Sequence, residues 1–245
     1  MILEVCVDSV ESSVNAEAGG ADRLELCGAL GIGGITPGAG TIDSVTANVS
    51  IPVYVMIRPR GGDFLYSDYE FEVMRRDIDF AREAGATGVV FGILLPDGRV
   101  DTERTAWLTG YASPLPVTFH RAFDLAADPF RALEDIIAAG PARILTSGQQ
   151  NSALSGAGLI ADLIEKARGR ITVMPGAGIN QTNFMELVRI TGATEYHLTG
   201  RKVAESSMQF RRRGIALGHP ALADDDYLLR YADSETIAAI KRTMK

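Results

Sequence analysis

Cysteine is scarce in this chain of 245 residues, which contains only Cys6 and Cys27. Two cysteines build no disulfide framework, and free thiols are the default in a reducing compartment. No apolar run approaches the roughly 20 residues that a membrane helix needs, and the amino terminus lacks the pattern of a signal peptide. The sequence therefore predicts a cytoplasmic protein with no membrane partner and no dependence on disulfides.

Basic residues are also in deficit, with 24 lysines and arginines against 31 aspartates and glutamates, giving a net charge of −7. This balance provides no electrostatic footprint for a nucleic acid backbone. We therefore expect a small molecule or another protein as the partner, and no nucleic acid. Because 46% of the residues are hydrophobic, the chain can bury a substantial core.

Short runs rich in β-branched residues alternate with longer helical patterns along most of the chain. Eight runs qualify as strands, namely ILEVCV, RLEL, VYVMIR, GVVFG, VTFHR, RILTS, ITVMPG and EYHLTG. Helical patterns lie between them, for example over 67–84 and 129–139. Such alternation predicts βαβ units and a parallel sheet.

A glycine-containing turn precedes every second strand, in AGGAD, AGATG, AGPAR and TGATE. Glycine after a helix end supplies the left-handed cap from which the chain enters the next strand. Pairs of β-α units thus follow one another without a linker. Eight strands in this length predict an α/β fold, a single (β/α)8 TIM barrel over 1–245 with a C-terminal helix. An open doubly wound sheet is the alternative, but the GxGxxG that would follow its first strand is missing.

The strand and helix repeats occupy about 1–200, and 201–245 form a C-terminal extension. We interpret 200–233 as a loop with a local excursion, followed by a helix over 234–245. The RRR at 211–213 is interpreted as a solvated face, and DDD follows at 224–226. The length of this loop makes it a candidate lid or dimer contact.

Strand parity places an unusually polar set of side chains inside the barrel. Apolar residues of a barrel strand face the helices, and the alternate residues face the axis. The inward set comprises Glu4, Cys6, Glu25, Cys27, Arg58, His120, Thr146, Glu195 and His197. A barrel built only for stability would fill these layers with aliphatic residues. Because an unpaired buried charge is costly, Glu4, Glu25 and Arg58 should pair with one another or with a ligand.

Both cysteines stand in the same phrase, Leu-Glu-apolar-Cys, at inward positions of neighbouring strands. Such strands lie roughly 4.8 Å apart, so Cys6 and Cys27 can share one ligand if their registers agree. Two thiolates suit the soft ion Cu(I), whereas zinc would need more ligands and a Cys-x2-Cys spacing. The alternative is that each thiol is a small buried hydrophobe. A nucleophilic role is disfavoured because the flanking glutamates raise a thiol pKa.

The loops after the strands carry groups that bind small anions. RPRGGD brings Arg58 and Arg60 beside two glycines, and guanidinium groups bind carboxylate or phosphate bidentately; an exposed turn is the alternative. His120 can act as a base, acid or ligand, or be a satisfied core histidine. Further ligand-binding candidates lie in the same loops or at the same strand ends. They are Asp8, Arg121, Thr146, Ser147, Gly148, Gly176, Gly178 and His197.

Several phrases together resemble the CutC family of copper homeostasis proteins over about 1–200. They are LEVCVDS, GGADRLELC, GGITPGAG, PVYVMIRPRGGDFLYSD, GVVFGIL, PVTFHRAFD, RILTSGQ and MPGAGIN. The resemblance implies a cytoplasmic (β/α)8 barrel, commonly a homodimer, that takes part in copper handling. Gly38 and Ala177 depart from the family pattern, which usually has serine and glycine at these places.

Two functional hypotheses follow. In the first, implied by the resemblance, the protein takes part in copper homeostasis by binding Cu(I) through Cys6 and Cys27. In the second, it is an enzyme acting on a small phosphorylated or carboxylated metabolite at the C-terminal mouth of the barrel. There His120 is the proton-transfer candidate, with Glu25 or Glu4 as its partner and with Arg58 and Arg60 as an anion clamp. No reaction can be assigned from the residues.

Overall fold

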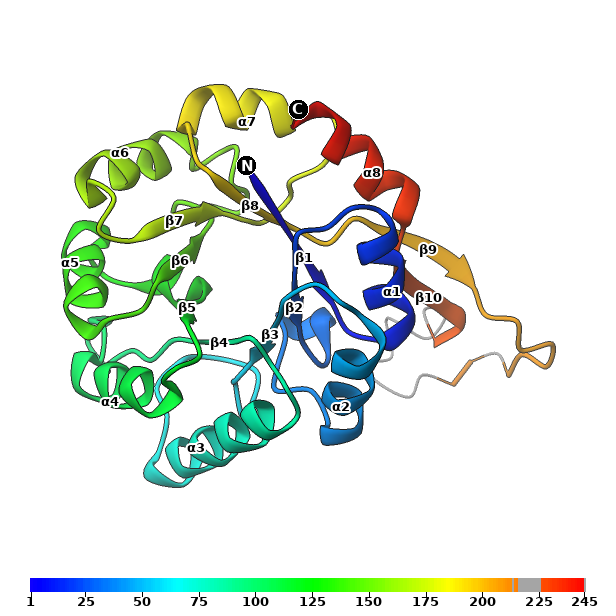
Figure 1. Ribbon diagram of the computed structural model, residues 1–245, viewed down its shortest axis with the longest axis horizontal. Helices are drawn as coiled ribbons and strands as arrows, with labels where there is room; N and C mark the ends of the chain where they lie inside the picture. The colour runs from blue at the N-terminus through cyan, green and yellow to red at the C-terminus, as the bar shows by residue number, and fades with distance from the viewer. Residues whose placement is uncertain (213, 216–225, 245) are drawn as a thin grey trace.

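Eight parallel strands form a nearly closed barrel surrounded by helices in the computed structural model (Figure 1), which describes residues 1–212, 214–215 and 226–244. The strands are β1 (Ile2–Val7), β2 (Arg23–Leu26), β3 (Val53–Met56), β4 (Gly88–Phe91), β5 (Val117–Phe119), β6 (Arg143–Thr146), β7 (Thr172–Pro175) and β8 (Glu195–Leu198). Their hydrogen-bonded order is β7-β6-β5-β4-β3-β2-β1-β8, and β7 contacts β8 where the barrel closes. The predicted eight-stranded α/β barrel is thus confirmed.

Helices follow the strands around the outside of the barrel. They are α1 (Val10–Ala18), α2 (Ala39–Asn48), α3 (Asp68–Glu83), α4 (Thr102–Ala112), α5 (Pro129–Ala139), α6 (Ala157–Ala167), α7 (Phe184–Thr191) and the C-terminal α8 (Ser234–Thr243). Short 3-10 helices occur at Leu30–Ile32 and Arg121–Leu125. None of the helices in the described ranges has the length and apolar character needed to cross a membrane.

Local signals explain where the helices begin and end. Ser67 and Glu70 form a capping box at the start of α3, which satisfies backbone N–H groups that the helix leaves free. Asp128 caps α5, Pro129 occupies its first turn, and Gly140 ends it with a φ of +94°. The predicted helix over 129–139 is confirmed, and the one over 67–84 is one residue shorter at each end.

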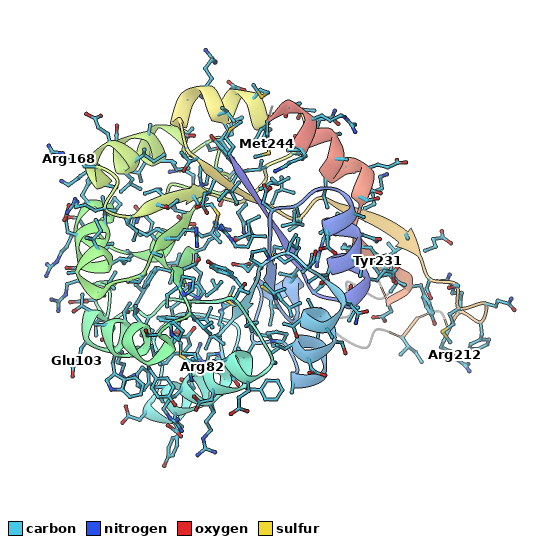
Figure 2. The ribbon with its side chains drawn as sticks, viewed as in Figure 1. Arg82, Glu103, Arg168, Arg212, Tyr231 and Met244 are labelled. Carbon is cyan, nitrogen blue, oxygen red and sulfur yellow. The ribbon has the colours of Figure 1, made fainter. Side chains whose placement is uncertain are left out.

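Strand parity separates an apolar layer that faces the helices, as predicted, from the side chains inside the barrel. The larger core lies between strands and helices and contains the fully buried Leu3, Val5 and Leu24. A second, smaller cluster fills the inside of the barrel and consists of Cys6, Cys27, Tyr54, Met56 and Val90. Side chains therefore occupy the centre of the ring of strands (Figure 2).

Two arginines and two glutamates form an ion network inside the barrel, at the amino ends of the strands. Arg23 donates from Nε to Glu4 Oε2 at 2.5 Å and from Nη2 to Glu195 Oε2 at 2.6 Å. Arg143 donates from Nε to the same Glu195 oxygen at 2.6 Å. Both guanidinium groups also lie against the ring of Tyr54. The network pairs every charge that it buries, as low-dielectric surroundings require.

The extension after β8 contains a hairpin that the sequence analysis did not predict. β9 (Arg201–Glu205) pairs antiparallel with β10 (Leu228–Ala232), and the hairpin extends sideways from the barrel next to α1 (Figure 1). The expectation of a loop over 200–233 was wrong here because two short strands far apart in sequence give no local hairpin signal. Residue 213 of the RRR run and residues 224–225 of the DDD run lie outside the described residues. Residue 245, at the end of the expected C-terminal helix, also lies outside them.

The buried network gives a test of the fold. We expect Arg23→Met to lower the free energy of unfolding by about 3–5 kcal/mol, because it leaves the Glu4 and Glu195 carboxylates without their shared cation. Urea denaturation followed by circular dichroism measures the change. The exposed Arg76, which pairs with Glu72 on α3, provides the control, and Arg76→Ala should change stability little. Equal losses in the two variants would contradict the role of the network.

Candidate functional site

A cavity of about 250 Å³ lies at the carboxyl ends of the strands. Its lining comes from β1, β2, β3, β6 and β8 and from the loops after β2, β3, β5, β7 and β8, and it combines apolar walls with several polar groups. The lining residues are Cys6, Glu25, Leu30, Gly33, Met56, Arg58, Phe64, His120, Arg121, Leu145, Ala177, Gly178, Ile179, His197, Leu198 and Thr199. This is the end of the barrel at which TIM-barrel active sites lie.

Cys6 lines this cavity and contacts Cys27, which is fully buried outside the lining. Cys6 Sγ lies 3.7 Å from Cys27 Sγ, and Cys27 Sγ lies 3.5 Å from Glu25 Oε2. Cys6 of β1 stands opposite Glu25 of β2. Cys27 lies two residues after Glu25, just beyond the end of β2, and its sulfur therefore meets that of Cys6 diagonally. Gly34 covers Cys27, since a Cβ there would lie 3.0 Å from the sulfur. Both cysteines are buried and free of a disulfide.

Both thiols are held in the protonated form. The hydrogen bond with Cys27 and burial raise the pKa of Cys6 well above its usual value. For Cys27, the bond from Cys6 lowers the pKa, but burial and the nearby Glu25 outweigh it and raise the pKa to about 11. A neutral thiol pair is a poor nucleophile, so the discounted role in nucleophilic catalysis gains no support here.

His197 connects the thiol pair to the ion network below it. Its Nδ1 lies 2.7 Å from Glu4 Oε1, and its Nε2 lies 3.9 Å from Glu25 Oε2. Burial lowers the pKa of His197, but the charge of Glu25 and the bonds to Cys6 and Glu4 raise it well above 6.5. Burial raises the pKa of Glu4, yet His197 and Arg23 bring it down to about 2. His197 is therefore an imidazolium balanced by a carboxylate.

Glu25 has an environment unlike that of Glu4. Burial raises its pKa, and the charge of His197 opposes this shift only in part. Its Oε1 is buried without any hydrogen-bond partner in the described part of the chain. Because Glu25 lines the cavity, this free oxygen is available to a bound molecule.

Arg58 and His120 form the upper part of the cavity. Arg58 follows β3, is 5% exposed, and donates from Nη1 and Nη2 to the carbonyl oxygens of Ile32, Gly34 and Gly62. His120 follows β5, and its Nδ1 accepts a hydrogen bond of 3.2 Å from the amide of Ala122. The hydrogen of the neutral ring therefore resides on Nε2.

Phe64 supports both of these side chains. The guanidinium carbon of Arg58 lies 4.8 Å from the centre of the Phe64 ring, and the His120 ring centre lies 4.7 Å from it. Gly92 leaves room for the imidazole, since a Cβ there would lie 2.6 Å from His120 Nδ1. The sequence analysis missed Phe64 and Gly92, although Phe64 directly follows the RPRGGD phrase that it singled out.

Some predicted site residues lie outside the cavity lining. Arg60 points away from the cavity and forms ion pairs with Asp63 at 2.8 Å and with Glu70 of α3 at 2.5 Å. The predicted anion clamp of Arg58 and Arg60 is therefore not formed. Arg58 pairs with neither Glu4 nor Glu25, so of the two expected alternatives for Arg58, pairing with these carboxylates is not formed and pairing with a ligand stays a prediction. Its guanidinium is held by carbonyl groups instead, because the loop after β2 and the loop after β3 surround its two terminal nitrogens.

Polar candidates near β6 serve a different centre. Asp124 accepts hydrogen bonds from the Thr146 and Ser147 hydroxyls, and it pairs with Arg121 at 2.7 Å. In β6, Leu145 faces the inside of the barrel and lines the cavity, so the inward orientation predicted for Thr146 was wrong. Arg143, two residues before Leu145, also faces inward, and it is the residue of β6 whose polarity indicates which positions point to the axis.

The remaining candidates support neighbouring backbone. Asp8 pairs with Arg201 of β9 at 2.5 Å and lies outside the lining. Gly148 packs directly against Gly156, whose carbonyl oxygen would lie 2.3 Å from a Cβ at position 148. A Cβ at Gly176 would collide with Leu145. Of the three glycine candidates, only Gly178 lines the cavity.

Two overlapping groups of side chains have the spacing of metal ligands. One consists of Cys6, Glu25 and Cys27, the other of Glu4, Glu25 and His197, and in each group the ligand atoms lie within 4.8 Å of one another. The first offers two soft sulfur donors, which select Cu(I) over hard cations. In the second, His197 and Glu4 are already engaged with each other. The thiol group therefore fits a soft metal better.

The protonation of His120 gives a second test. Burial and the charge of Arg58 lower the pKa of His120 to about 3. A folded pKa below the ordinary 6.5 means that the stability contributed by the neutral ring is complete above pH 6.5 and is lost as pH falls toward 3. Relative to His120→Gln, the wild type should lose up to about 1.4 kcal/mol per pH unit in this window.

Urea denaturation across this range measures that difference, and nitrogen NMR of the imidazoles measures the ring directly. His120 should remain the Nε2–H tautomer from about pH 8 to about pH 5, while His197 stays doubly protonated. Titration of His120 near its ordinary value would show that the ring is not held in this environment.

The sequence of this chain matches one protein family along most of its length. The family model for the CutC family matches residues 1–202. The chain is 51% identical over 244 residues to the human copper homeostasis protein cutC homolog, covering 100% of this chain and 89% of the relative. It is 46% identical over 243 residues to a family protein CutC of Chromobacterium violaceum, covering 99% and 98%.

A solved structure supports the same assignment. It is described as a copper homeostasis protein CutC from Streptococcus agalactiae, and it superimposes with a TM-score of 0.77 at 33% identity. The match covers 81% of this chain and 98% of that one. The barrel, the family model and relatives at this level of identity lead to one conclusion, which is that this chain belongs to the CutC family of copper homeostasis proteins.

Proposed function

We propose that this CutC family member takes part in copper homeostasis by holding Cu(I) between Cys6 and Cys27. The single observation that carries the proposal is the contact of two buried, reduced thiols at 3.7 Å. Thiolate sulfur is the ligand type that favours Cu(I), and the cavity reaches Cys6, whose sulfur contacts that of Cys27. Copper is here the cargo of the site.

Charge balance supports the same proposal. Two neutral thiols become two thiolates when they bind Cu(I), so the site gains one net negative charge and releases two protons. The imidazolium of His197, which interacts with Cys6, lies in place to balance that charge. Because both thiol pKa values are raised, the affinity for Cu(I) increases with pH, by up to about tenfold per pH unit for each proton released.

The test is an anaerobic titration of the reduced protein with Cu(I) in competition with a chromophoric chelator. We expect one Cu(I) per chain, and we expect the double variant Cys6→Ser, Cys27→Ser to lose it because serine hydroxyls are hard ligands. Each single variant should also bind far more weakly than the wild type. Repeating the titration at a higher pH should strengthen binding.

Met208→Leu is the matched control, because it removes an exposed thioether of the hairpin segment and leaves both thiols in place. Its affinity should equal that of the wild type. Circular dichroism confirms that each cysteine variant is folded. Unchanged Cu(I) affinity in the double variant would rule out this site.

We also propose that the protein works in the cytoplasm as a homodimer. Two cysteines in a chain of 245 residues build no disulfide framework, which is typical of a reducing compartment. For the dimer, the support is the row of exposed apolar side chains on the segment that contains β9 and β10, including Val203, Met208 and Phe210. Apolar surface gathered on a projecting hairpin is typical of a protein contact.

Sedimentation velocity tests the dimer. The wild type should sediment as a dimer, and Phe210→Glu should shift it toward the monomer because it buries a charge in the contact. Val73→Glu, at a similarly exposed apolar position on α3, is the control and should leave the mass unchanged. A monomeric wild type at every concentration would contradict the proposal.

A second candidate function is an enzyme that acts on a small phosphorylated or carboxylated metabolite in the same cavity. The observation that favours it is the set of buried polar atoms without partners, Glu25 Oε1, Arg58 Nε and His120 Nε2. With its raised pKa and free oxygen, Glu25 is suited to proton transfer. With a pKa of about 3, His120 stays neutral and can donate a hydrogen bond from Nε2. Glu4 holds the ring of His197 in place through its bond to Nδ1.

A further inference from the structure

The upper part of the cavity contains a buried cation without a counter-ion. Among the described residues, no carboxylate forms an ion pair with Arg58, and its guanidinium donates from Nη1 and Nη2 to neutral carbonyl oxygens. The other arginines near the barrel axis are paired, Arg23 and Arg143 with Glu195 and Arg121 with Asp124. A buried charge that lacks a partner is costly unless a ligand supplies one.

A second free donor lies beside this cation. His120 is 3% exposed, and its Nε2 has no partner among the described residues. Since Nδ1 accepts from Ala122, Nε2 carries the hydrogen and can only donate. Arg58 and His120 both pack on Phe64, so the two donors flank one aromatic ring. Arg58 Nε is likewise buried and unpartnered.

These atoms are concentrated in one place. Seven buried side-chain polar atoms have no partner in the described part of the chain, and three of them belong to residues that line this cavity. Folded proteins satisfy nearly all such atoms, with protein, water or ligand. Two donors stand near the mouth, and Glu25 Oε1 stands at the floor.

We propose that the cavity binds a small hydroxycarboxylic acid, with its carboxylate between Arg58 Nε and His120 Nε2 and its hydroxyl at Glu25 Oε1. The assignment follows from charge and shape. One unpaired cation and one neutral donor match a single negative charge with two acceptor oxygens. A phosphate dianion would leave one charge uncompensated, because Arg121 is already paired with Asp124. The aliphatic walls from Leu30, Met56 and Leu145 suit a short carbon chain.

This inference deepens the second candidate function, since it names the ligand class of the same cavity, and it is independent of copper. Cu(I) binding would use the two sulfurs, whereas the carboxylate of the acid is held by Arg58 and His120 and its hydroxyl reaches Glu25, which contacts Cys27. Binding is therefore measured on the copper-free, reduced protein. The enzyme proposal concerns turnover, so a positive binding result without turnover would separate the two.

The experiment is a separate titration of the wild type with each of lactate, glycerate and 3-hydroxybutyrate. Nitrogen NMR of the imidazole rings and calorimetry monitor the binding. We expect at least one acid to bind and to shift the His120 Nε2 resonance, because that group gains an acceptor. Lactamide, which has the shape of lactate without its charge, should bind much more weakly. Propionate, which lacks the hydroxyl, should bind more weakly than lactate.

Variants locate the carboxylate. Arg58→Met should raise Kd roughly 10- to 100-fold, because a charge-assisted hydrogen bond is lost. His120→Phe keeps a ring on Phe64 and removes the donor, so it should raise Kd by a smaller factor of up to roughly tenfold. Arg76→Ala, an exposed arginine of α3, should bind as the wild type does.

Three outcomes would overturn the proposal. None of the acids binds at millimolar concentration; lactamide binds as tightly as lactate; or inorganic phosphate shifts His120 whereas the acids do not. The NMR shift is measured on the wild type, so the result stands even if Arg58→Met fails to fold. Undiminished binding in a folded Arg58→Met would likewise reject the assigned position of the carboxylate.

Discussion

Charge pairing along the barrel axis is the constraint on which the rest of this structure depends. At the amino ends of the strands, Arg23 and Arg143 neutralise Glu4 and Glu195. One layer higher, His197 bonds to Glu4 and faces Glu25. Since buried ions must be paired, each layer fixes the protonation of the next. The exception is Arg58 at the mouth, where pairing ends and the cavity begins. The lower layers thus have a structural role, and the unpaired groups mark the binding surface.

The repeated Leu-Glu-apolar-Cys phrase acquires its meaning from register. Equal parity on β1 and β2 turns both glutamates and both cysteines inward, but the strands are offset so that Cys6 stands opposite Glu25. The offset separates the glutamates, one into the ion network and the other into the cavity, and it brings the sulfurs to 3.7 Å. Two tetrapeptides that differ only in Val5 and Leu26 therefore give Glu4 a pKa of about 2 and Glu25 a raised one.

The sequence alone was sufficient for the barrel and for most inward positions, because strand periodicity is a local property. It was not sufficient for groups whose role depends on distant partners. Arg58 and Arg60 are two residues apart and chemically equal, yet Glu70 of α3 draws Arg60 away from the cavity. Thr146 was placed one residue out of phase, since RILT contains apolar residues at both parities. The β9 and β10 hairpin joins strands too far apart to be recognised locally.

Copper homeostasis, the role in the family name, accounts for only some of the groups that line the cavity. A copper carrier needs the sulfurs and a path to them, and it has no use for a buried guanidinium held open by three carbonyl groups. Leaving Arg58 Nε and His120 Nε2 buried without partners among the described residues costs stability in a protein that could pair or replace them. Such a cost persists where binding a ligand offsets it. These unpaired donors thus support the proposal that an organic ligand occupies the cavity beside the thiols.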